Sequence, residues 1–203
     1  MSEISNEILN QIFHQTIYGS QDSDQLGAAI FGIAMTTRGK NFLELGVRDG
    51  KTTVPLLGAC KLLGSELTSV DITDPQFSCP ESLRENWKFV KQDAIEFLKN
   101  NTKRFDLIFI DDWHEGIHIK RELDLLSPLC DKSTLILLHD LMHHWTNPEY
   151  NTCCNYGNSN LIAGKEDDWD NGGPYWAVNQ LDKNVWEYST IPYSNGLTIL
   201  RKK

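Results

Sequence analysis

The apolar run Leu107 to Ile110, with charged residues on both sides, constrains the fold of this chain more than any other segment. A run this short and this uniformly apolar is typical of a strand buried on both faces, as in the middle of a parallel sheet. Asp111 and Asp112 follow it directly. Ligands of open α/β sheets bind just beyond the carboxyl ends of the strands, so the sequence predicts that the chemistry is centred on Asp111.

Short strands and helices alternate along most of the chain. Strands are expected at 41–45, 67–71, 87–90, 105–111 and 134–139, and helices at 51–63, 93–100 and 115–126. A helix at 175–181 and two strands at 185–191 and 196–200 follow; the join between these strands has hairpin chemistry, so they are antiparallel. Two helices are expected before the first strand, at 4–17 and 23–37, the second capped by Ser23 or Asp24. This order predicts an α/β fold with a doubly wound, mostly parallel, seven-stranded Rossmann-like sheet.

One domain is expected over residues 1–203, with 1–38 as an N-terminal helical cap and 145–175 as an inserted loop. The loop has no apolar periodicity but is rich in Trp and Tyr, which argues against plain disorder. Because it follows the fifth strand, we expect it to be a substrate lid; the alternative is an oligomer contact that buries the same aromatic side chains. The aromatic residues expected to contact a substrate are Trp113, Trp145, Trp169 and Trp176.

The composition narrows the class of partner. A net charge of -9 argues against non-specific binding of nucleic acid, which depends on phosphate neutralisation. No apolar stretch approaches the length of a membrane span, and the N-terminus lacks the features of a signal peptide. Five cysteines at irregular spacing do not suggest a disulfide framework, so a cytoplasmic protein is expected.

The segment 44–50, Glu-Leu-Gly-Val-Arg-Asp-Gly, lies at a strand–turn–helix joint. Gly46 and Gly50 permit a tight turn and the close approach of a ligand to the backbone. The helix that follows offers free N–H groups, and Thr52 is placed to donate from its hydroxyl. The GxxxG spacing differs from the GxGxxG of dinucleotide binders, which weakens a reading as an NAD site.

Acidic residues mark the ends of the next two strands. Asp71 ends the second strand, where a carboxylate can accept both hydroxyls of a ribose, and Asp93 follows the third. Each residue alone could equally be a helix cap or a turn residue. Together with the glycine turn, they favour a nucleoside-type ligand.

This ordered set of motifs resembles the class I S-adenosylmethionine-dependent methyltransferases. The set comprises ELGxxxG, an acid ending strand two, an acid after strand three, and FDLIFID on strand four. The runs IDDWHEGIHIKRELDLLSPL and LILLHD are similar to the branch that contains macrocin O-methyltransferase and cephalosporin-hydroxylase-like proteins. The strand-four motif also resembles that of catechol O-methyltransferase. The likeness covers about residues 40–144 and the tail.

The resemblance implies roles for individual residues. Glu44 and Gly46 would bracket the methionine end of the cofactor, Thr52 would bind its carboxylate, Asp71 its ribose and Asp93 its adenine. The full set of implied cofactor-binding residues is Glu44, Gly46, Gly50, Thr52, Asp71, Asp93 and Asp111.

The resemblance also implies a divalent metal ion, held in metal-dependent relatives by the strand-four acid and an acidic pair after strand five. Asp111 and Asp140 fill two of these places, and His139 stands where an acid often does. Leu141 stands where catechol-type enzymes carry Asn. These departures weaken the case for an oxygen-only Mg²⁺ site and admit softer ions, with Mg²⁺ or Mn²⁺ expected ahead of Zn²⁺.

The expected activity is O-methylation of a small hydroxylated acceptor, such as a sugar or a natural-product intermediate, with Asp111 and His114 as catalytic residues. His114 stands near the basic lysine of catechol-type enzymes, and an imidazole suits a general base at neutral pH; an ordinary loop residue is the alternative. The sequence leaves open whether the chain forms a homo-oligomer. One rival is an inactive cofactor-binding protein. Another is a nucleotide-sugar oxidoreductase on a related fold, disfavoured by the missing GxGxxG and Tyr-x-x-x-Lys.

Overall fold

The computed structural model describes residues 6–20, 22–142 and 173–203. Its helices are α1 (Asn6–Tyr18), α2 (Asp22–Gln25), α3 (Gly27–Thr37), α4 (Thr53–Leu63), α5 (Ala94–Asn100), α6 (Gly116–Leu126) and α7 (Gly173–Asn179), with short 3₁₀ turns η1 (Glu81–Asn86) and η2 (Ser127–Leu129). Its strands are β1 (Asn41–Leu45), β2 (Glu66–Asp71), β3 (Trp87–Lys91), β4 (Leu107–Ile110), β5 (Leu135–Leu138), β6 (Trp186–Ile191) and β7 (Leu197–Lys202).

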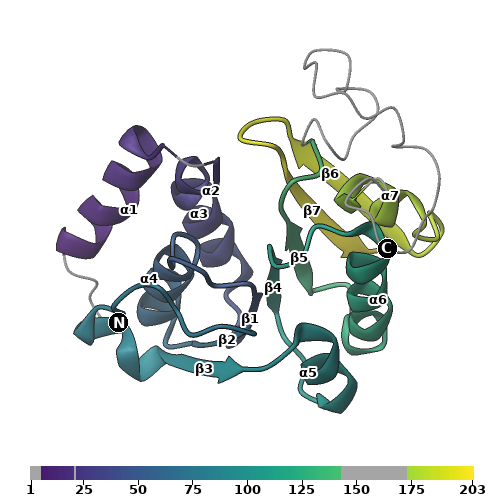
Figure 1. The fold of residues 1–203 in the computed structure, drawn as a ribbon, viewed down its shortest axis with the longest axis horizontal. Coiled ribbons are helices and arrows are strands. Elements are labelled where there is room, and N and C mark those ends of the chain that lie inside the picture. Colours follow the sequence, from purple (N-terminus) through teal and green to yellow (C-terminus); the bar gives the residue numbers. More distant parts are fainter. Residues whose placement is uncertain (1–5, 21, 143–172) are drawn as a thin grey trace.

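The strands form one sheet in the order β3-β2-β1-β4-β5-β7-β6 (Figure 1). Neighbours from β3 to β5 are parallel, whereas β7 is antiparallel to both β5 and β6. The predicted fold class is therefore confirmed, including the antiparallel terminal pair. The strand order reverses between β1 and β4, which is where open α/β sheets form a binding crevice.

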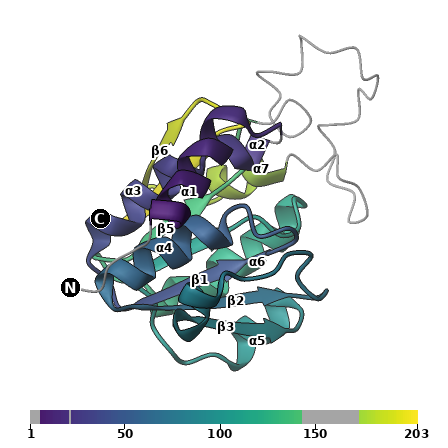
Figure 2. The same ribbon diagram turned by 90° about the vertical axis from the view of Figure 1, so that its left-hand side faces the viewer.

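Helices cover both faces of the sheet, and β4 explains why. Leu107 and Phe109 point into a core that includes residues of α1, α3 and α4, while Ile108 and Ile110 point into a core that includes residues of α5, α6 and α7. Figure 2 shows α1, α3 and α4 on one side of the strands and α5 on the other. Because successive side chains of a strand face opposite ways, a strand buried on both faces has to be apolar throughout.

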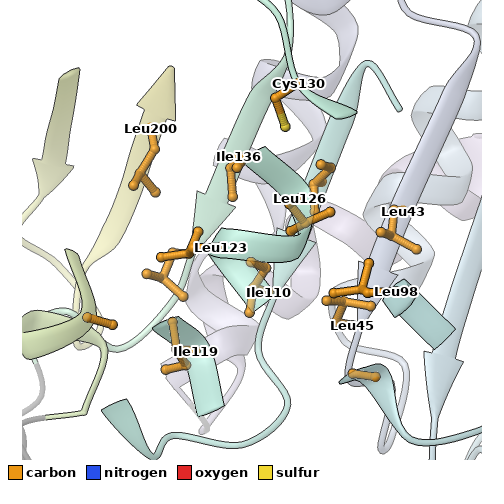
Figure 3. Packing of buried hydrophobic residues seen from close by; sticks show 14 of the residues in the cluster. Leu43, Leu45, Leu98, Ile110, Ile119, Leu123, Leu126, Cys130, Ile136 and Leu200 are labelled. Atoms are coloured by element: carbon orange, nitrogen blue, oxygen red, sulfur yellow. The ribbon is translucent and has the colours of Figure 1, made fainter. Parts of the chain in front are cut away.

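The core on the second face depends on one amphipathic helix. Ile119, Leu123 and Leu126 of α6 are almost completely buried and lie in the same cluster as Ile110 and Ile136 of the strands (Figure 3). Their i, i+4 and i, i+3 spacing places them on one face of the helix. This packing fixes the position of α6 relative to the end of β4, which matters for the side chains on its first turns.

The expected helix 23–37 is divided at Leu26 into α2 and α3, and the expected cap is wrong because Ser23 and Asp24 lie within α2. The backbone N–H of Ala28, in the first turn of α3, donates to Thr16 Oγ1 of α1, at 2.9 Å. The buried Asp24 forms an ion pair with Lys51, at 3.1 Å. Both contacts come from distant parts of the chain, so local capping rules miss them.

The expected lid, 145–175, lies outside the described residues up to residue 172, as do Trp145 and Trp169. Among the helices that the structure describes, none is long and apolar enough to cross a membrane.

Candidate active site

A cavity of about 480 Å³ lies at the carboxyl ends of β1, β2 and β4, a size typical of small-molecule sites. The predicted site residues that line it are Gly46, Thr52, Asp71, Asp93, Asp111, Trp113 and His114. The predicted residues Glu44, Gly50, His139 and Asp140 are not part of its lining. The structure therefore brings residues from four separate segments of the chain to one hollow.

Gly46 lets β1 and β4 end side by side at the cavity. Its φ is 90°, and a Cβ there would stand 2.3 Å from the backbone oxygen of Asp111. Gly50, with φ 74°, leaves room for the ring of Phe77, which would be 2.5 Å from a Cβ. Both positions require glycine, but for different neighbours: Gly46 for the backbone beside the cavity, Gly50 for a packed ring.

Glu44 is fully buried beside the cavity wall. Its carboxylate accepts hydrogen bonds from Thr52 Oγ1 at 2.8 Å, Thr53 Oγ1 at 2.9 Å and Ser69 Oγ at 2.6 Å. Burial raises the pKa of Glu44 to about 7, against the opposing effect of these hydrogen bonds. Glu44 thus ties β1 to β2 and to the start of α4, and the Thr52 hydroxyl expected to reach a cofactor donates to Glu44.

Asp71 lines the cavity, and its carboxylate accepts four hydrogen bonds. Oδ2 accepts from the N–H groups of Val47 at 2.9 Å and Arg48 at 3.2 Å; Oδ1 accepts from the N–H and hydroxyl of Thr73, at 2.8 and 2.9 Å. Burial alone would raise the pKa of Asp71, but these hydrogen bonds lower it overall. A carboxylate has about four lone-pair positions, so a ribose hydroxyl would have to replace the Thr73 hydroxyl, the donor that rotates freely.

Asp93 serves as a helix cap and also lines the cavity. Its Oδ1 accepts a hydrogen bond from the N–H of Glu96, at 2.9 Å, at the start of α5. Asp93 can therefore cap α5 and face the cavity in the same conformation.

Four predicted residues meet just beyond the ends of β4 and β5, and of these Asp111 and His114 line the cavity. Asp111 Oδ1 lies 3.2 Å from both His114 Nε2 and His139 Nδ1. Asp140 Oδ2 lies 2.7 Å from His114 Nε2, and its Oδ1 lies 3.4 Å from His139 Nδ1. One ligand atom from each of Asp111, His139 and Asp140 falls within 4.8 Å of the others. Asp140 has a φ of 64°, a conformation costly for a residue other than glycine, which is common at functional sites.

The charges of this cluster depend on one another. Burial would raise the pKa of Asp111, but His139 and His114 hold it well below its usual range. Burial would lower the pKa of both histidines, but Asp111 and Asp140 raise each to about 10. Without a bound cation, the two carboxylates therefore favour the protonated form of both histidines.

The orientation of His139 suits a metal ligand. Its Nε2 lies 2.9 Å from the carbonyl oxygen of Ser194, which can only accept, so Nε2 carries a hydrogen and Nδ1 faces the carboxylates. Metal-binding histidines commonly donate their other N–H to such a carbonyl. Two carboxylate oxygens and one oriented imidazole nitrogen fit a divalent cation, with Mn²⁺ and Zn²⁺ suited to the mixed donors.

A second cluster, of Asp112, His118 and Glu122, was missed by the sequence analysis. His118 Nε2 lies 3.2 Å from Asp112 Oδ2 and 3.5 Å from Glu122 Oε1. Glu122 is fully buried, and burial together with the charge of Asp112 raises its pKa well above its usual value. The i, i+4 spacing of His118 and Glu122 in the predicted helix 115–126 was the available signal.

The two described tryptophans of the predicted substrate set lie in different places. Trp113 lines the cavity and is about half exposed, whereas Trp176 lies on α7 and is not part of the lining.

Comparison with known proteins shows what the middle of the chain is similar to. Residues 43–141 match the model of a family described as a methyltransferase domain. No curated protein matches the chain. The predicted resemblance to class I S-adenosylmethionine-dependent methyltransferases is confirmed by this match together with the fold.

Solved structures of methyltransferases share the fold at low sequence identity. The SAH-bound methyltransferase PaMTH1 of Podospora anserina has a TM-score of 0.65 at 18% identity, over 98% of this chain and 89% of that chain. The O-methyltransferase of Bacillus cereus in complex with SAH has a TM-score of 0.64 at 14% identity, over 98% and 92%. The O-methyltransferase TomG of Streptomyces achromogenes, involved in tomaymycin synthesis and solved with SAM, has a TM-score of 0.62 at 12% identity, over 100% and 92%.

Proposed function

We propose that this chain transfers the methyl group of S-adenosylmethionine to an oxygen of a small hydroxylated acceptor, because residues 43–141 match the model of a methyltransferase domain. A sugar or a natural-product intermediate is the proposed acceptor class. A divalent cation held by Asp111, His139 and Asp140 is part of the proposal. Support comes from the fold and from similar structures that were solved with SAM or SAH.

The observation that carries the proposal is a cavity whose wall combines two kinds of group. Gly46, Asp71 and Asp93 line it at the ends of β1, β2 and β3, where a nucleoside-type cofactor would be recognised. Asp111 and His114 line it at the end of β4. A cofactor bound along the first set would therefore have its methionine end beside the second.

Transfer to oxygen requires an in-line approach of the acceptor and loss of its proton. S-adenosylmethionine supplies a methyl group on a sulfonium, and a bound cation would supply Lewis-acid polarisation of the acceptor hydroxyl. His114 can take the proton only as the neutral ring, which charge compensation of Asp111 and Asp140 favours. Fixing both reactants in one cavity contributes much of the rate, because the reaction is bimolecular.

The acidic balance of the chain supports a small acceptor. A net charge of -9 disfavours the phosphate backbone of nucleic acid. Trp113, on the cavity wall, offers an aromatic face to an acceptor ring. A cytoplasmic location remains part of the proposal.

Calorimetric titration of the full chain with S-adenosylmethionine tests the proposal, with Mg²⁺, with Mn²⁺ and with a chelator. We expect micromolar binding, strongly weakened in Asp71→Ala because a charged acceptor for a ribose hydroxyl is lost. Asp74→Ala is the matched control, since Asp74 is an exposed acid paired with Lys91. Production of S-adenosylhomocysteine with added acceptors then separates an enzyme from an inactive binding protein. No cofactor binding under any of these conditions would overturn the proposal.

A further inference from the structure

The cluster of Asp112, His118 and Glu122 lies beside the cavity but apart from the Asp111–His139–Asp140 set. Asp112 follows β4, and its side chain reaches the cavity wall together with that of His118. His118 and Glu122 are four residues apart on α6, so they lie on one face of that helix. The buried stripe of α6 packs against the sheet, which fixes their distance from Asp112 (Figure 3).

The carboxylates of this cluster have fewer partners than their burial requires. Glu122 is fully buried, and neither of its carboxylate oxygens accepts a hydrogen bond from any residue in the part of the chain that the structure describes. The same holds for Asp112 Oδ1. His118 Nε2 lies 3.2 Å from Asp112 Oδ2, within hydrogen-bond distance, and 3.5 Å from Glu122 Oε1. A buried carboxylate without hydrogen bonds is costly, which points to a ligand not supplied by these residues.

We propose that Asp112, His118 and Glu122 bind a divalent transition-metal ion, Zn²⁺ or Mn²⁺. One ligand atom from each residue lies within 4.8 Å of the others. Ligand atoms at about 2.1 Å from a tetrahedral ion are separated by about 3.4 Å. The separations of His118 Nε2 from the two carboxylates, 3.2 and 3.5 Å, match that spacing.

The charges are compatible with an ion, because two carboxylates, a neutral imidazole and a divalent cation balance in a buried site. An imidazole nitrogen with two carboxylate oxygens suits Zn²⁺ or Mn²⁺ better than an oxygen-only ion. Three protein ligands would leave a further position open, and two of them, Asp112 and His118, line the cavity. This inference goes beyond the proposed methyl transfer and does not depend on it.

Metal titration of the full chain without cofactor tests the site. The double variant Asp111→Asn/His139→Gln removes two ligands of the first cluster, which consists of Asp111, His139 and Asp140. After chelator treatment, this variant is titrated with ZnCl₂ against a chromophoric chelator. We expect one bound Zn²⁺ per chain, with an affinity that falls by at least about ten-fold on adding His118→Gln or Asp112→Asn. Ten-fold is the smallest effect typical of losing even an outer-shell partner of a metal site.

Asp124→Asn in the same background is the matched control, because it removes one carboxylate from α6 at an exposed position paired with Lys120. It should leave the Zn²⁺ affinity unchanged. Circular dichroism has to show that each variant folds. If His118→Gln does not fold, Asp112→Asn is used for the test, and the reverse. Absence of bound Zn²⁺ in the background variant, or equal affinity with and without His118, would overturn the proposal and leave a plain ion-paired triad. Because no S-adenosylmethionine is present, that failure is distinct from failure of the proposed function.

Discussion

Two adjacent carboxylates at the end of β4 face different partners. Asp111 contacts His114 and His139, and Asp112 contacts His118. Consecutive residues after a strand diverge, so one short loop contributes to two clusters. A substitution at either position should therefore affect only one of them.

For Asp111→Asn, we expect an affinity for S-adenosylmethionine within a few fold of the wild type and a turnover reduced by at least about 100-fold. The amide preserves the shape of the cavity wall but removes the charge that orients His114 and His139. Calorimetry and initial rates measure the two effects separately. Wild-type turnover in this variant would mean that the assignment of metal or base is wrong.

Glu44 gives a prediction about stability and pH. Its pKa is about 7 in the folded chain against an ordinary value near 4.5, so the folded state keeps a proton that the unfolded state loses. The contribution of Glu44 to the free energy of unfolding is greatest at a pH below its ordinary pKa. This contribution falls by about 3 kcal/mol as the pH rises through 7. Glu44→Gln stays neutral, so it should gain stability relative to the wild type between about pH 5 and about pH 8.

Urea unfolding at the two pH values measures this difference. Glu96→Gln, an exposed glutamate paired with Lys99, is the control and should show no such gain. A constant difference between Glu44→Gln and the wild type would contradict the proton assigned to Glu44.

For helices and strands, the sequence predicts those features that follow from the pattern of apolar and polar residues. The uniformly apolar run of β4 was recognisable because both its faces are buried. The division of α2 from α3 was not, because it depends on Thr16 and Lys51, which only the folded chain brings close.

The same distinction holds in the candidate site. Strand-end acids such as Asp71 and Asp111 were identifiable because a parallel sheet collects its carboxyl ends at one edge. The partnership of Glu44 with Ser69 was not, because it depends on the register between β1 and β2. Likewise, the carbonyl that orients His139 belongs to Ser194, on a turn 55 residues further along the chain.

The β6–β7 hairpin gives a prediction for an element. Gly196 has a φ of 91°, and a Cβ there would stand 2.4 Å from Met142 Cγ. Gly196→Ala should destabilise the chain by about 1–3 kcal/mol and, by shifting the carbonyl of Ser194, weaken metal binding by about ten-fold. Thermal unfolding and Mn²⁺ titration measure the two effects.

Gly32→Ala is the matched control. Gly32 is an exposed residue inside α3, and a Cβ there would meet nothing within 4 Å. This substitution should stabilise the chain by about 0.5–1 kcal/mol and leave metal binding unchanged. Unchanged metal affinity in Gly196→Ala would show that the hairpin does not orient His139.

For the whole molecule, we propose that the N-terminal helices and the sheet unfold as one unit. Ile12 of α1 is fully buried in the core that also contains Phe42 and Phe109 of the sheet. Ile12→Ala should cost about 2–5 kcal/mol in a single urea transition. Ile17→Ala, on the same helix but 66% exposed, should change stability by less than about 0.5 kcal/mol. A separate early transition in Ile12→Ala would instead indicate a detachable cap.

The contact between His139 and the carbonyl of Ser194 also has a consequence for folding during synthesis. A ribosome releases Asp111, His139 and Asp140 well before the turn that holds His139, because that turn comes 55 residues later. Parallel strands up to β5 can pair as they emerge, whereas β7, which pairs with β5, is made last. A nascent chain therefore carries every donor atom of the first cluster without its final geometry. We expect cation binding and catalytic activity to arise together, and only after the β6–β7 hairpin has been synthesised.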